Sequence, residues 1–226
     1  EFANAFWDEV DRRRGEVRAA ERYEPDAKNF ATPIKKMVGR YYLETRQDYI
    51  RERQRIRREI SNPVRRRRAL QKLVKNIKPI VDFKALFVPD YVDKVVMIAP
   101  QLAFEDVVLH TDSQYKIDRI KKSLGRDKLD MIYLLGGNGW NNPKLVEWAE
   151  KYIQGAIFCD GFFLDSQRPA TRLFTGKFKA NFDREPSMME AEAHDTAGIV
   201  KTIIEKKKPA SRQDFRKALL TMDRFP

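Results

Sequence analysis

The chain has 226 residues, of which 42% are hydrophobic and 11% aromatic, so it has enough apolar surface to bury a core and is not disordered throughout. No stretch approaches the roughly 18 consecutive apolar residues that a membrane span needs. The formal net charge of +12 raises nucleic acid as a partner. Most of that charge lies in residues 46–78, which contain 13 Lys and Arg residues and only 3 Asp and Glu residues. The rest of the chain is therefore close to neutral.

The first forty residues predict a helix, a strand and a second helix. Residues 1–10 (EFANAFWDEV) place apolar side chains on one helical face, and residues 16–23 (EVRAAERY) form a short β-like run. A helix is expected within residues 29–42, with Asn29 or Asp26 as its cap. Because the chain begins inside an amphipathic pattern, we expect it to be a fragment of a longer protein.

Residues 44–79 predict a basic helical hairpin inserted on the surface, broken at Ser61-Asn62-Pro63. Three explanations of its charge stay open: contact with an anionic membrane or polymer, a sequence-independent nucleic-acid contact, or a solvated insert that serves solubility. The segment between Arg51 and Lys78 has no aromatic residue for base stacking, which argues against nucleic acid. The side chains expected to meet an anionic surface are Arg51, Arg53, Arg55, Arg65, Arg66, Arg67 and Arg68.

Strand and helix patterns alternate through the middle of the chain. In order they are a strand at 82–90, a helix at 91–108 that Pro100 bends or ends, a charged insert at 110–130, a strand at 131–137, a helix at 143–152 and a strand at 155–165. The last sixty residues are predicted to be mainly helical, with Ser211 as a cap. This alternation predicts an α/β fold with a doubly wound parallel sheet, in which ligands bind at the carboxyl ends of strands.

No group of residues predicts catalysis, a metal site or a cofactor. His194 and Asp195 are neighbours on a predicted helix, so their side chains point about 100° apart. The loop sequence GGNG at residues 136–139 is not followed by the Lys-Ser/Thr of a phosphate loop, and a tight turn with positive φ is its favoured explanation. Cys159 lies in an apolar run and is expected to be a buried, inert thiol. We therefore expect a protein that is not an enzyme.

The chain resembles the type I periplasmic solute-binding proteins, in particular the branched-chain amino-acid receptors and the penicillin-binding-protein activator lipoproteins. The segments that carry this resemblance are DFKALFVPD, APQLAF, LLGGNGWNNPKL, GAIFCDGFFLDS and FKANFDREPSMMEAEAHDTAGIV. The resemblance covers residues 1–45 and 80–222, and it leaves both basic inserts unmatched.

This resemblance implies two lobes that close on a ligand. Residues 1–163 would form most of the C-terminal lobe, with the basic insert at 44–79, and residues 164–226 the helical part of the N-terminal lobe. Further lobe segments would lie upstream and downstream of the chain. The implied ligand-binding residues are Asp90, Tyr91, Asn138 and Trp140.

Two of these positions have a second interpretation. Amino-acid receptors of the family place an acidic residue where this chain has Asn138, so Asp90 is the candidate partner of a ligand ammonium; Asp90 could equally cap the following helix. Trp140 could stack on a ligand or close the edge of the sheet.

The resemblance implies a periplasmic receptor that clamps a small polar, amino-acid-like ligand for the membrane subunits of an ABC transporter. A lipid anchor to the envelope would then lie upstream of Glu1. The alternative is an envelope lipoprotein that docks on a cell-wall synthase, which the unmatched basic inserts favour. A weaker alternative is a basic nucleic-acid-binding domain.

Overall fold

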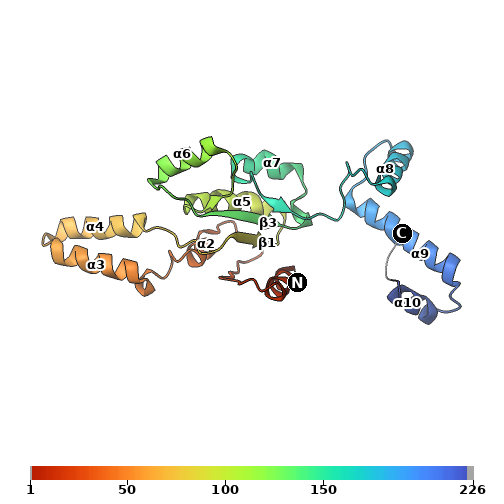
Figure 1. The fold of residues 1–226 in the computed structure, drawn as a ribbon, viewed down its shortest axis with the longest axis horizontal. Coiled ribbons are helices and arrows are strands. Elements are labelled where there is room, and N and C mark those ends of the chain that lie inside the picture. Colours follow the sequence, from red (N-terminus) through yellow and green to blue (C-terminus); the bar gives the residue numbers. More distant parts are fainter. Residues whose placement is uncertain (1, 223–226) are drawn as a thin grey trace. The chain divides into compact units, whose positions relative to one another are not determined.

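The computed structural model describes residues 2–222, which form two compact units that divide between Cys159 and Asp160 (Figure 1). Unit 1 contains, in chain order, α1 (Phe2–Arg12), α2 (Ala31–Met37), α3 (Gln47–Glu59), α4 (Pro63–Asn76), β1 (Ala85–Val88), α5 (Val92–Phe104), β2 (Val108–Leu109), α6 (Gln114–Leu124), β3 (Met131–Gly136), α7 (Pro143–Ala149) and β4 (Ile157–Phe158). Unit 2 contains α8 (Pro169–Phe182), α9 (Met188–Lys207) and α10 (Arg212–Leu220).

The four strands form one parallel sheet with β3 at its centre. β1 pairs with β3 along its whole length, from Ala85 opposite Tyr133 to Val88 opposite Gly136. β2 pairs with the first two residues of β3, and β4 pairs with the last two. The Ile132 carbonyl accepts from the amide of His110, directly after β2, and the Gly136 carbonyl accepts from the amide of Cys159, directly after β4. Carbonyls four residues apart in a strand point to the same edge. The two short strands therefore share one edge of β3.

The core lies on one face of this sheet, beneath α5, with α2 and α7 beside it. Its fully buried members include Val95 and Leu102 of α5 and Ile132 and Leu134 of β3, which alternate with more exposed residues along the strand. On the other face the Phe6 ring of α1 stacks on Phe87 at 4.3 Å. The predicted α/β class with a parallel sheet is thus confirmed.

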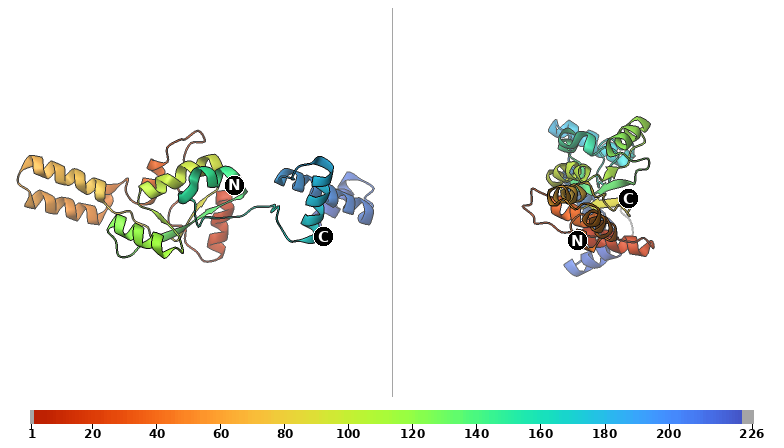
Figure 2. Two further views of the ribbon diagram at one scale, coloured as in Figure 1. Left: turned by 90° about the horizontal axis from the view of Figure 1, so that it is seen from above. Right: turned by 90° about the vertical axis from the view of Figure 1, so that its left-hand side faces the viewer.

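The predicted helical hairpin is also present, as the antiparallel pair α3 and α4, which lie side by side in the view from above (Figure 2). Two arginines hold its base to the core. Arg46, only 9% exposed, donates through Nη1 to the carbonyls of Gly39 and Lys78, at 3.1 and 3.0 Å. Arg40 donates through Nε to the Ile77 carbonyl at 2.9 Å, and its two terminal nitrogens bind Glu105 and Asp106. These bonds fix both ends of the insert on the rest of unit 1.

Three expectations about local structure are wrong. Residues 16–23 form no strand: the segment is tied down by side chains instead, with Arg18 on Asp82 and Tyr23 on Asp90. The helix expected at 91–108 continues through Pro100 but ends at Phe104, and its last predicted residue, Val108, begins β2. Cys159 is exposed because β4 is only two residues long and lies at an edge.

Unit 2 is held mainly by local signals. Ser211 accepts a hydrogen bond from the Asp214 amide at 3.2 Å and caps α10, as predicted. α8 carries a row of aromatic contacts from Phe174 through Phe178 to Phe182. The unit begins at residue 160, whereas the sequence placed a lobe boundary after residue 163. The assignment of the two units to lobes stays a prediction. Within residues 2–222, no helix is long and apolar enough to cross a membrane.

Candidate functional site at the ends of β1 and β3

The loops that follow β1 and β3 meet at the carboxyl edge of the sheet. Because Val88 pairs with Gly136, Asp90 and Asn138 each lie two residues beyond the end of their strand. A Cβ placed on Gly139 would lie only 3.1 Å from the Asp90 carbonyl oxygen and 3.1 Å from Cδ1 of Tyr91. Glycine at this position therefore lets the two loops touch, and three of the predicted site residues gather there.

Asp90 is held by two hydrogen bonds. The Tyr23 hydroxyl donates to Oδ2 at 2.8 Å, and the Tyr91 amide donates to Oδ1 at 2.7 Å. Burial raises the pKa of Tyr23 above its ordinary value, and the hydrogen bond to the Asp90 carboxylate raises it further. The phenol therefore keeps its proton at neutral pH. Asp90 does not serve as the N-cap of α5, because that position belongs to Tyr91.

Sequence reasoning missed Tyr23 as part of this site. The residue lies 67 positions before Asp90, in the segment expected to be a strand, and no spacing motif links the two. Its position is fixed by packing: the Tyr23 ring meets Phe30 edge to face at 4.8 Å, and the Phe30 amide donates to Gln101 of α5. Only the three-dimensional path of residues 13–30 over α5 brings this phenol to the loop.

Trp140 differs from the other three predicted residues because its side chain is fully buried, at 0% exposure. Its indole lies directly over the backbone of Gly136, where a Cβ would be 2.1 Å from Cδ2 of the ring. Burial supports the interpretation that Trp140 closes the core at the end of the sheet. Tyr91, at 73% exposure, and Asn138 lie on the surface.

The glycines of the GGNG loop do not serve the purpose expected from the sequence. None of Gly136, Gly137 and Gly139 has a positive φ. Gly136 is required by the indole above it and Gly139 by the neighbouring loop, so two of the three are needed for close approach rather than for a left-handed turn.

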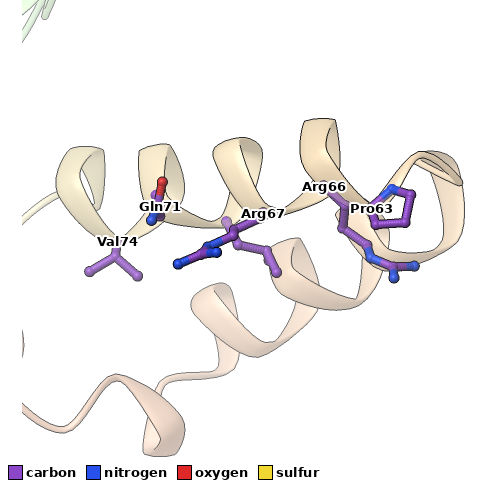
Figure 3. Close-up of a pocket in the computed structure, with 6 residues that line it drawn as sticks. Pro63, Arg66, Arg67, Gln71 and Val74 are labelled. Atoms are coloured by element: carbon purple, nitrogen blue, oxygen red, sulfur yellow. The ribbon is translucent and has the colours of Figure 1, made fainter.

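Two shallow grooves lie elsewhere in unit 1, and neither is lined by the four predicted residues. One, of about 570 Å³, is bordered by α7 and β4. The other, of about 430 Å³, runs along α4 (Figure 3). Among residues 2–222, no group of three or more His, Cys, Asp or Glu side chains is placed to hold a metal ion.

No protein-family model matches the chain, and no curated protein matches its sequence. A structure search matches the chain to a leucine-binding protein, LivK, from Thermotoga maritima, with 15% sequence identity and a TM-score of 0.49. The similarity covers 96% of this chain and 44% of the leucine-binding protein, so the chain spans less than half the length of that protein. This level of likeness assigns no ligand to the chain. Its fold class rests on its own strand register.

Proposed function

We propose that this chain is a solute-binding protein that takes a small polar, amino-acid-like ligand where the loops after β1 and β3 meet. The observation that supports this most is the contact of Gly139 with Asp90 and Tyr91. The contact supports the proposal because it brings the Asp90 carboxylate and the exposed Tyr91 ring next to the loop that contains Asn138. Ligands of parallel α/β sheets bind at this carboxyl edge.

The chemistry of these groups suits a ligand with an ammonium group. The Asp90 carboxylate accepts one bond on each oxygen, and each oxygen has a second acceptor position. A ligand ammonium would form a charge-assisted bond there, while the Asn138 amide would bind a carbonyl or carboxylate. On this proposal the chain works by binding alone. Its periplasmic location and its delivery of ligand to an ABC transporter rest on the sequence resemblance.

A thermal-shift screen with amino acids, amides, nucleotides and cell-wall fragments at millimolar concentration tests the proposal. A ligand at 100 times its dissociation constant stabilises the folded state by about 2.7 kcal/mol, which raises the Tm by a few degrees. We expect such a shift with an amino acid or amide, and we expect Asp90→Asn to abolish it. A panel that gives no shift contradicts the proposal.

Two tyrosines of nearly equal exposure supply a matched control. Tyr91 is 73% exposed at the proposed site, and Tyr115 is 75% exposed on α6. Tyr91→Ala should weaken ligand binding by about tenfold or more, and Tyr115→Ala should leave it unchanged. Equal losses in the two variants would show that the ligand does not bind between the loops.

The α3–α4 hairpin favours a second candidate function, docking on another macromolecule. Its Arg and Lys side chains outnumber its acidic ones, and Arg40 and Arg46 bond its base to the rest of unit 1. Concentrated charge of one sign attracts and steers an oppositely charged partner. This function would make the chain an envelope interaction module, for example on a cell-wall synthase, and it does not require a bound solute.

A further inference from the structure

The charges of the hairpin are largely unpaired. Arg53 pairs with Glu44 and Arg55 with Glu52. Within residues 2–222, the basic side chains of α3 and α4 that form no ion pair are Arg51, Arg57, Arg58, Arg65, Arg66, Arg67, Arg68, Lys72 and Lys75. Mutual repulsion of so many like charges is unfavourable, and an acidic partner would relieve it.

The exposed surface of α4 has two different faces. At 100° per residue, Arg65, Arg68, Lys72 and Lys75 share an outward basic face. The groove is lined by a separate row of residues: Pro63, Arg66, Arg67, Leu70, Gln71 and Val74. Figure 3 labels all of them except Leu70. That row combines apolar side chains with two guanidinium groups. It is about 16 Å long at 1.5 Å per residue, close to three turns of a helix.

The pairing of apolar and cationic side chains decides between classes of partner. A nucleic-acid backbone would use the basic groups but would bury little on Leu70 and Val74. A membrane-surface helix needs a broad apolar face, whereas this apolar row is narrow and flanked by arginines. An amphipathic protein helix with acidic flanks would use both, with apolar anchors on the row and carboxylates on Arg66 and Arg67.

We propose that the groove along α4 is a docking site for an acidic, amphipathic helical segment of a protein partner. The anchors of that segment would lie on Leu70 and Val74, and its Asp or Glu side chains would pair with the groove arginines. This inference rests on the docking function proposed above and deepens it. It does not depend on ligand binding near Asp90, so a failed solute screen leaves it standing.

The test is a selection from a random-peptide library on the whole 226-residue chain, with unselected library as the baseline. We expect enriched peptides to carry Asp and Glu together with apolar residues at i, i+3 or i+4 spacing. Selected peptides should lose at least about tenfold in affinity for Val74→Asp, measured by fluorescence anisotropy. No enrichment, or enrichment of peptides that lack acidic residues, overturns the proposal.

Paired variants separate the groove from the overall charge. Val64→Asp introduces the same charge on the same helix outside the groove, and Val64 is even more exposed than Val74, at 61% against 48%. Arg67→Glu and Arg68→Glu form a second pair, of which only Arg67 lines the groove. We expect Val74→Asp and Arg67→Glu to weaken peptide binding at least about fivefold more than their partners. Equal losses within both pairs refute a specific groove.

Two further probes identify the competing partners. A 20-base-pair DNA duplex and vesicles that contain phosphatidylglycerol are tested against the same four variants. If the duplex or the vesicles bind more tightly than the selected peptides and are insensitive to Val74→Asp, the hairpin is a polyanion or membrane contact and the proposal is wrong. All four substituted positions are solvent-accessible, so folding is expected to survive; circular dichroism checks that it does.

Discussion

The two units of the chain are stabilised in different ways. Unit 1 has a continuous core that joins α2, α5 and α7 to one face of the sheet, with Leu102, Ile132 and Trp140 at or near zero exposure. In the described part of unit 2, the buried apolar side chains are those of Ala191 and Ile203, together with Pro186. Exposed apolar residues are frequent on its helices, among them Leu173, Phe182, Met189, Ile204 and Leu220.

This difference shows that secondary structure and tertiary stability have separate origins. The helices of unit 2 have well-defined ends: Ser187 and Glu190 form a capping box on α9, and Asp183 and Lys208 end α8 and α9 in the left-handed conformation. Caps stabilise a helix by about 1 kcal/mol each, which offsets only part of its conformational entropy. Unit 1 gains in addition from burying a core, so the two units should unfold differently.

The largest expected effect appears when the units are separated. A fragment of residues 1–159 should unfold in one cooperative urea transition. A fragment of residues 160–226 should lose ellipticity gradually, because helices of this length are marginal without packing. Far-UV circular dichroism at two protein concentrations measures both, and the second concentration detects self-association. A sigmoidal transition in the smaller fragment that is independent of concentration would contradict the comparison.

The next largest effect is expected from adding one methyl group at the end of the sheet in unit 1, which should lower the stability of that unit. In Gly136→Ala the new Cβ would lie 2.1 to 2.6 Å from three indole atoms of Trp140. The indole is fully buried, so we expect the overpacking to cost about 1–3 kcal/mol in the free energy of unfolding. Urea denaturation followed by Trp fluorescence measures it.

Gly137→Ala is the matched control for that substitution. Gly137 has a φ of −108°, and a Cβ there would meet nothing within 4 Å. Its free energy of unfolding should stay within about 0.5 kcal/mol of the parent chain. Equal losses at the two positions would show that the loop backbone, and not the indole, sets the requirement for glycine.

Periodicity and turn chemistry were sufficient to predict most elements of the chain. The hairpin break at Pro63, the two main strands and the cap at Ser211 are all local signals, and the structure has each of them. Residues 16–23 show where this method fails. Their alternation resembles a strand, but they have no partner strand and are fixed by long-range side-chain bonds such as Arg18 to Asp82. Such bonds leave no mark in the local pattern.

The sequence predicted which loops form the candidate site, but not how the side chains within it are packed and hydrogen-bonded. That Asp90 and Asn138 each follow a strand of a parallel sheet was predictable from the sequence, and such strands end at one edge. That the two strands are neighbours is known only from the structure. The burial of Trp140 and the hydrogen bond from Tyr23 could not, since both depend on how distant segments pack. The glycine loop illustrates the same point. Its composition suggested positive φ, while the structure uses Gly136 and Gly139 for contacts that only the folded chain contains.

The smallest expected effect is a pH dependence at the start of α9 in unit 2. Hydrogen bonds from Ser187, and then from Arg184, lower the pKa of the Glu190 carboxyl from 4.5 to about 2. A lowered folded-state pKa means that this carboxylate stabilises the capped helix above about pH 4.5, and that the contribution is lost as pH falls through about 2. A carboxyl carbon titration by NMR should show a midpoint near 2.

Glu190→Gln should remove that acid-dependent loss of α9 helicity and leave a helix that is less well capped at neutral pH. Glu192→Gln, two residues further along the same helix and exposed, should retain the loss. If the parent chain and Glu190→Gln lose α9 amide protection in parallel between pH 4.5 and 2, the capping box does not hold this end of the helix. Local caps would then contribute less to the stability of the unit 2 helices than the comparison with unit 1 suggests. The few buried side chains of unit 2 would have to contribute more.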